Sequence, residues 1–124
     1  MSKLIRGALS FVDQNWKAIS GFTLLLITTL SLIPIPELPQ LPGSDKTHHL
    51  VAYGLLMFPV ALHKPPKWMY IGLGFIVWSG AIELIQPYIN RYGEWLDLLA
   101  NALGVFLGYF TAKLVLKVYK KNDR

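Results

Sequence analysis

The chain has 124 residues, of which 53% are hydrophobic and 15% are charged, and this balance argues against a soluble domain, which carries about 25% charged residues. The sequence contains no cysteine, which excludes disulfides and thiolate metal sites. The net charge of +5 would suit a nucleic-acid-binding protein, but the basic residues are spread over loops and chain ends. The length predicts one domain, 1–124.

The N-terminal stretch SKLIRGALSFVDQNWK places apolar residues at helical spacing, and Lys3, Arg6 and Asp13 fall on another face. This pattern predicts a short amphipathic helix that lies in the interface on the cytoplasmic side of a membrane. No nucleic-acid contact is expected, because the basic residues fit contacts with anionic lipids instead.

Four apolar runs follow and predict four transmembrane helices. The third and fourth runs have the length of a bilayer-spanning helix, whereas the second reaches it only if the helix includes DKTH. A soluble bundle is a weaker interpretation, because so short a chain cannot bury four such helices on all sides. A cleaved signal peptide is weaker too, because PIPELPQLP follows the first run instead of small residues. The predicted spans are about 17–33, 45–62, 68–89 and 95–116.

The basic residues predict the orientation of these helices. Ten of the twelve Lys and Arg residues precede the first helix, lie between the second and third, or finish the chain. Only Lys46 and Arg91 lie on the opposite side. By the positive-inside rule, both termini are expected in the cytoplasm of a bacterial inner-membrane, multi-pass protein. The fold class is therefore all-α, an integral membrane four-helix bundle.

Polar residues recur toward the outer ends of the last three helices, and we interpret them as one outward-facing polar pocket. Glu83 would sit roughly 10 Å below the outer boundary, so it needs a partner such as His49, Lys46 or Arg91. An alternative is a purely structural polar network. A metal site is disfavoured because adjacent histidines point about 100° apart on a helix, and no cofactor is expected. The candidate ligand-binding residues are Asp45, Lys46, His49, Tyr53, Glu83, Gln86, Arg91, Asp97 and Asn101.

The glycines Gly104 and Gly108 have the spacing that lets two membrane helices approach closely, and we expect them to form a helix-packing face. Glu83 and His49 are the candidates for catalysis, as an acid–base pair, if the protein is an enzyme. The sequence shows no nucleophile motif and no cofactor loop, so whether it is an enzyme stays open.

Three segments resemble VanZ-like membrane proteins: DKTHHLVAY, ELIQ and RYGEWLDLLANALGVFLG, in that order. The resemblance covers residues 45–108 and includes all the candidate residues above, whereas His48 falls on an unconstrained position. Glu94 departs from the small hydroxyl residue that this family often carries there. The resemblance implies a four-helix protein of the bacterial cytoplasmic membrane. It links the family to resistance to glycopeptide-type antibiotics without supplying a reaction.

Three functions remain in view. The first is binding of the head group of an anionic lipid or a cell-envelope precursor, which fits Lys46 and Arg91 as phosphate contacts. The second is an acid–base enzyme that acts on such a head group. The third is a small proton-coupled exporter, which is less consistent because the glutamate is confined to one end of its helix. The ligand, the oligomeric state and any link to resistance are not determined by the sequence.

Overall fold

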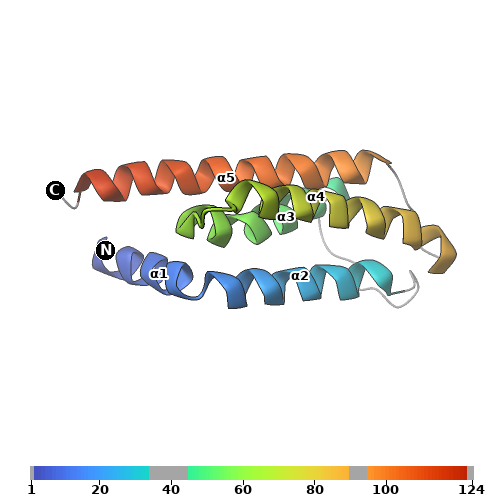
Figure 1. Ribbon diagram of the computed structural model, residues 1–124, viewed down its shortest axis with the longest axis horizontal. Helices are drawn as coiled ribbons and strands as arrows, with labels where there is room; N and C mark the ends of the chain where they lie inside the picture. Colours follow the sequence, from blue (N-terminus) through green and yellow to red (C-terminus); the bar gives the residue numbers. More distant parts are fainter. Residues whose placement is uncertain (1, 34–44, 90–94, 123–124) are drawn as a thin grey trace.

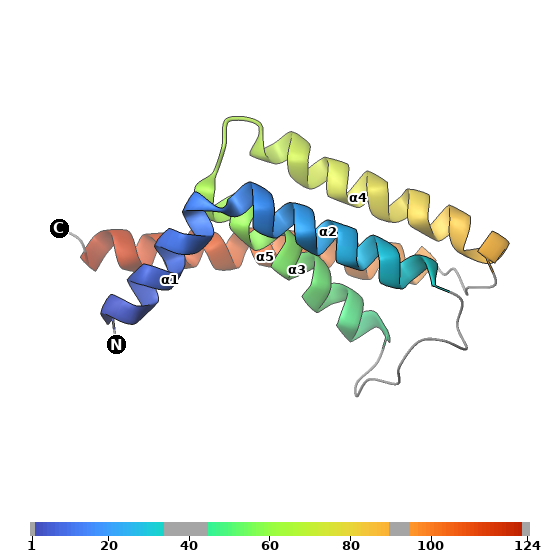
Figure 2. The ribbon, with the colours of Figure 1, turned by 90° about the horizontal axis from the view of Figure 1, so that it is seen from below.

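The computed structural model describes residues 2–33, 45–89 and 95–122, and every regular element in these ranges is a helix. Figure 1 shows the helices aligned along one long axis, and Figure 2 shows α1 leaving the line of α2 at an angle. The start of α1 and the last turns of α5 lie at the same end of the molecule in both views. In chain order the elements are α1 (Ser2–Gln14), α2 (Trp16–Leu32), α3 (Asp45–His63), α4 (Trp68–Ile85), the 3₁₀ helix η2 (Gln86–Ile89) and α5 (Trp95–Asn122).

The most extensive helix contact joins α3 and α5, which run parallel. His49 meets Asn101 near the starts of both helices, and Gly54 meets Gly108 further along. A Cβ atom added at Gly104 would overlap the carbonyl oxygen of Leu50, and one added at Gly108 would overlap that of Gly54. The two backbones therefore approach so closely that only glycine fits on the α5 side of the contact.

The other helices run against this parallel pair. Ser20 near the start of α2 donates a hydrogen bond to the carbonyl of Leu56 in the second half of α3, at 3.2 Å. Trp68 at the start of α4 stacks on Tyr109 of α5, with ring centroids 4.6 Å apart. The chain thus alternates in direction from α2 through α5, which brings the N-terminal ends of α3 and α5 together at one end of the molecule.

The helix boundaries follow the apolar runs closely, with two differences. The expected helix 68–89 ends as an α-helix at Ile85 and continues as a 3₁₀ turn. Gln86 keeps α-helical dihedrals and donates its backbone N–H to Ile82, but Pro87 has no N–H to continue the α-helical hydrogen bonds. The last helix, expected to end near 116, continues to Asn122, because the added residues are mostly lysine, valine and tyrosine, which tolerate a helix without needing burial.

The apolar residues of this protein lie mainly on its outside. Trp68–Tyr88 and Leu96–Tyr119 are long and apolar enough to cross a membrane, and only 22% and 28% of their most apolar stretches are buried. The helix Trp16–Leu32 is apolar but shorter. The interior holds an apolar core, which includes Leu56, Val60 and Phe75. Some polar side chains are buried as well: Ser20, Ser79, Gln86, Asp97 and Asn101.

Candidate functional site

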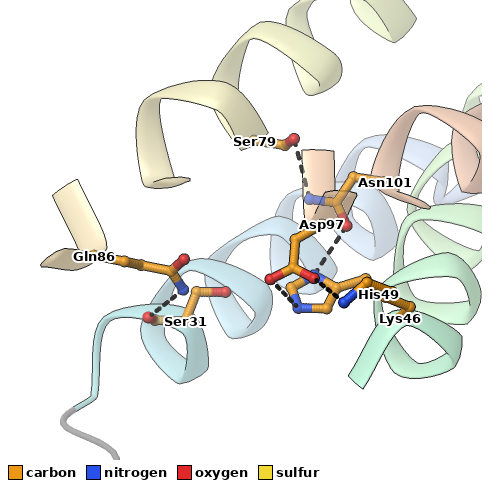
Figure 3. Close-up of polar contacts among 7 residues, drawn as sticks. All are labelled: Ser31, Lys46, His49, Ser79, Gln86, Asp97 and Asn101. Carbon is orange, nitrogen blue, oxygen red and sulfur yellow. Dashed lines mark hydrogen bonds and ion pairs between the residues drawn. The ribbon is translucent and has the colours of Figure 1, made fainter. Parts of the chain in front are cut away.

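Asn101 is the centre of a polar cluster that joins three helices (Figure 3). Its carbonyl oxygen lies 2.9 Å from Nδ1 of His49 on α3, and its amide nitrogen donates a hydrogen bond of 3.1 Å to the hydroxyl of Ser79 on α4. Both Asn101 and Ser79 are buried. Because each amide atom of Asn101 has a partner, this side chain ties α5 to both neighbours at little cost for burying a polar group.

The amide orientation defines the state of the histidine ring. The oxygen of Asn101 only accepts, so Nδ1 of His49 carries the proton in this contact. Nε2 faces the carboxylate of Asp97 at 3.9 Å. In the neutral ring Nε2 is an acceptor, and a proton there would turn the contact with Asp97 into an ion pair. His49 therefore contacts both Asn101 and Asp97 of α5, one with each ring nitrogen.

Asp97 also faces a cation one helical turn away from His49. The ammonium of Lys46 lies 3.6 Å from Oδ1 of Asp97, and both contacts appear in Figure 3. The side chain of Asp97 is 10% exposed, that of His49 is 21% exposed and that of Lys46 is 44% exposed. Asn101 and Asp97 therefore form the buried part of the cluster, and the ammonium of Lys46 forms its accessible edge.

Tyr53 and Glu83 extend the cluster along α3 and α4. The buried Tyr53 side chain is hydrogen-bonded with that of Ser79, and the carboxylate of Glu83 is close enough to act on it electrostatically. Glu83 itself is half-buried. Its expected approach to His49, Lys46, Arg91 or Asn101 stays a prediction.

Gln86 makes a separate contact on the α2 side. Its amide nitrogen donates to the carbonyl oxygen of Ser31 at 3.1 Å, close to the end of α2, and its own buried oxygen has no hydrogen-bond partner among the described residues. Figure 3 shows this pair apart from the Asn101 group. The last four carbonyls of an α-helix have no hydrogen-bond donor within the helix, and Gln86 supplies a donor to one of them.

The expected site residues fall into three groups. The structure brings Lys46, His49, Asp97 and Asn101 into direct contact, and it adds Tyr53 through Ser79, which shares the polar face of Glu83 but is not among the candidate ligand-binding residues. Gln86 lies beside α2 instead. The side chains of Asp45 and Arg91, like Glu94, lie outside what the structure describes. Ser79 stands four residues before Glu83 on the same helix face, and that spacing was the signal for it.

A metal ion does not fit the part of the chain that the structure describes, since no group of three His, Asp or Glu residues comes together there. The neighbouring His49 and Asp97 supply two donors, and Lys46 brings a competing positive charge to the same carboxylate. The arrangement instead suits a polar or anionic group that meets an ammonium, an imidazole and nearby hydroxyl and amide groups.

A second polar contact, which the sequence did not indicate, lies at the opposite end of α3. His63 and Asp13 are joined at 2.8 Å between Nδ1 and Oδ1, and the His63 ring stacks on Trp16 with centroids 5.1 Å apart. These residues lie 50 positions apart in the sequence. The contact fixes the end of α1 against the end of α3.

The described part of the chain is all-helical, contains two helices that are long and apolar enough to cross a membrane, and holds a polar cluster at one end. The chain matches the VanZ/LLP1 family over residues 6–116, which is most of its length, and it therefore belongs to that family. Comparisons with curated proteins and with solved structures returned no match.

Proposed function

We propose that the protein is a multi-pass protein of the bacterial inner membrane, a single domain, 1–124, in which α2 to α5 cross the bilayer. Large apolar side chains exposed on all four helices support this, for example Leu25, Val51, Leu73 and Leu107. The alternating helix directions fit four crossings, and the distribution of basic residues supports a cytoplasmic location of both termini. The exposed Leu4 and Phe11 of α1 suit an interfacial helix.

We further propose that the cluster around Asn101 and Asp97 binds the head group of an anionic lipid or a cell-envelope precursor at the outer face. The observation that carries this proposal is the ammonium of Lys46, which is accessible yet held by a buried carboxylate at 3.6 Å. A structural network alone needs no exposed cation at its rim. A phosphate would meet Lys46, while His49 would hydrogen-bond the polar remainder of the head group.

By resemblance only, envelope homeostasis and glycopeptide-type resistance are the biological settings that we propose, and head-group binding is a property that either setting could use. The alternative proposal is an acid–base enzyme that acts on such a head group, with Glu83 and His49 as its candidate catalytic residues. Asn101 holds Nδ1 of His49, and Nε2 faces Asp97.

Mass spectrometry of lipids that copurify with the intact protein tests the binding proposal. We expect the wild type to retain an anionic lipid above its share in the membrane, and Asn101→Leu and Glu83→Gln to lose that enrichment. Trp78→Phe is the matched control, since it removes a 2.9 Å interhelical hydrogen bond to Thr28 outside the cluster. An identical lipid profile in all four proteins would refute the proposal.

Cysteine labelling tests the topology independently. Single cysteines replace Gln40, expected outside, and Asn122, expected in the cytoplasm. An impermeant maleimide added to intact cells should label the first and spare the second. Labelling at position 122 would overturn the proposed orientation.

A further inference from the structure

A groove of about 300 Å³ lies between α3 and α5. Its lining comes from the first turns of both helices, namely Lys46, Thr47 and Leu50 of α3 and Leu96, Leu99, Ala100 and Leu103 of α5. The volume lies at the low end of the range of about 300–1,000 Å³ that small-molecule pockets occupy. The groove therefore has room for a single narrow apolar group.

The walls of this groove are mostly apolar, and its leucines on α5 are exposed. Leu99 and Leu103 are 48% and 50% exposed, and they lie one turn apart on α5, so they form a continuous apolar strip along the helix. Within the proposed membrane orientation, this strip starts near the outer head-group level and runs toward the bilayer centre. The direction and length suit a hydrocarbon chain that lies along the helices.

The polar end of the groove has a fixed positive charge. Lys46 belongs both to the groove and to the ion pair with Asp97, so the buried carboxylate restrains the ammonium at the point where the groove meets the outer surface. The side chain of Lys46 is 44% exposed, so its ammonium can be reached from outside while it stays beside Asp97. The groove thus joins an apolar channel to a cation, which is the complement of an anionic amphiphile.

We propose that this groove holds one acyl chain of an anionic phospholipid, with the lipid phosphate at the ammonium of Lys46. The proposal rests on the proposed head-group binding and deepens it, because it names the class of lipid and the side of the molecule on which its chain lies. Lys46 selects the charge of the head group, and the leucine strip between α3 and α5 orders the chain. Other membrane lipids contact the same strip without the contact to Lys46 and exchange from it more readily.

Photo-crosslinking tests the chain position. The full chain is placed in nanodiscs of phosphatidylcholine that contain phosphatidylglycerol with a diazirine in the middle of one acyl chain, and the crosslinked peptides are mapped by mass spectrometry. We expect labelling to concentrate on residues 96–103. Leu99→Trp should fill the groove and remove most of this labelling. Leu107→Trp is the control, because Leu107 is similarly exposed, at 51%, on the same helix and outside the groove.

The charge of the head group is tested in the same nanodiscs. Lys46→Gln should weaken labelling by phosphatidylglycerol about fivefold, the contribution of one basic residue near an anionic lipid. A phosphatidylcholine probe with the same diazirine should label the wild type weakly and should not respond to Lys46→Gln. Equal labelling by both probes would show that the groove holds bulk lipid without selection, and would overturn the proposal.

The two proposals fail in different ways. If Leu99→Trp leaves the labelling of residues 96–103 unchanged while Asn101→Leu still removes the copurifying lipid, the groove is not the chain site and head-group binding stands. If Leu99→Trp removes the labelling while Asn101→Leu and Glu83→Gln leave lipid copurification unchanged, the chain site stands and the head-group site does not lie in the polar cluster.

Discussion

Replacing a glycine of α5 by alanine tests the close contact between α3 and α5. At Gly108 the new Cβ would overlap the carbonyl oxygen of Gly54 and would lie 3.1 Å from both its carbonyl carbon and its Cα. These are backbone atoms within a helix, so they cannot rotate away as the end of a side chain could. Gly104 is in the same situation against Leu50, with Tyr53 Cβ at 3.1 Å. The helices must therefore separate to admit one methyl group.

The expected magnitude is a balance of two terms. Alanine gains about 0.5–1 kcal/mol over glycine within a helix, wherever it is placed. Overpacking a well-packed contact costs about 1–3 kcal/mol, and a clash with backbone belongs in the upper part of that range. Gly108→Ala should thus lower the free energy of unfolding by about 1–2 kcal/mol. Gly74→Ala provides the control, because a Cβ at Gly74 meets nothing within 4 Å, and it should be neutral or stabilising.

Equilibrium unfolding in mixed detergent micelles, followed by circular dichroism, measures both variants under the same conditions. Gly54→Ala adds a third point, since its Cβ would lie 3.4 Å from the carbonyl oxygen of Gly104, an ordinary contact. We expect the order of stability Gly74→Ala, Gly54→Ala, Gly108→Ala, from most to least stable. Equal changes in the free energy of unfolding for Gly74→Ala and Gly108→Ala would refute the reasoning. The higher helix propensity of alanine, which acts at both positions, would then be the only effect present.

Three further variants test individual contacts by the same unfolding assay. Asn101→Leu removes two interhelical hydrogen bonds, so it should lower the free energy of unfolding by about 1 kcal/mol, at about 0.6 kcal/mol for each bond. An unchanged free energy of unfolding would mean that the cluster contributes nothing to the stability of the fold. Trp78→Phe removes the single bond to Thr28 and should cost about half as much, so a larger loss would point to packing of the indole ring. Asp13→Ala removes the carboxylate that contacts His63. The two side chains are 49% and 41% exposed, so the change should cost no more than about 0.5 kcal/mol, and the loss should shrink at high salt where the two groups form an ion pair. A loss that does not respond to salt would mean that the hydrogen bond, and not the charge, fixes α1.

The sequence predicted the helices well because their apolar runs are long and separated by prolines and charged residues. The runs indicate where a helix is, but not how it ends. Pro87 shortened the α-helical part of α4, and the polar turns after 116 extended α5, since neither depends on hydrophobicity. The apolar pattern also does not predict the angle between α1 and α2, because that angle depends on the contacts of Trp16 and Asp13 with His63.

The sequence indicates which residues share the polar faces of the helices, but it does not indicate which of these residues contact one another. Asp97 and Asn101 fall on one face of α5 by spacing alone, and Lys46 and His49 are three residues apart on α3. Which of them meet depends on the rotation of the two helices, and Gly104 and Gly108 set that rotation through long-range contacts with α3. Gln86 shows the limit of the pattern, because it shares a helix face with Glu83 yet bonds a backbone carbonyl of α2.

The parallel pairing of α3 with α5 also imposes an order of events during synthesis. His49 and Asn101 are 52 positions apart, and at about 5–20 residues per second the ribosome adds that length in roughly 3–10 s. In the proposed topology, α3 reaches the membrane with its histidines and Lys46 before Asp97 and Asn101, their partners on α5, have been synthesised. Through that interval, water at the bilayer surface or the insertion machinery has to solvate the polar end of α3, and α5 completes the bundle when it arrives.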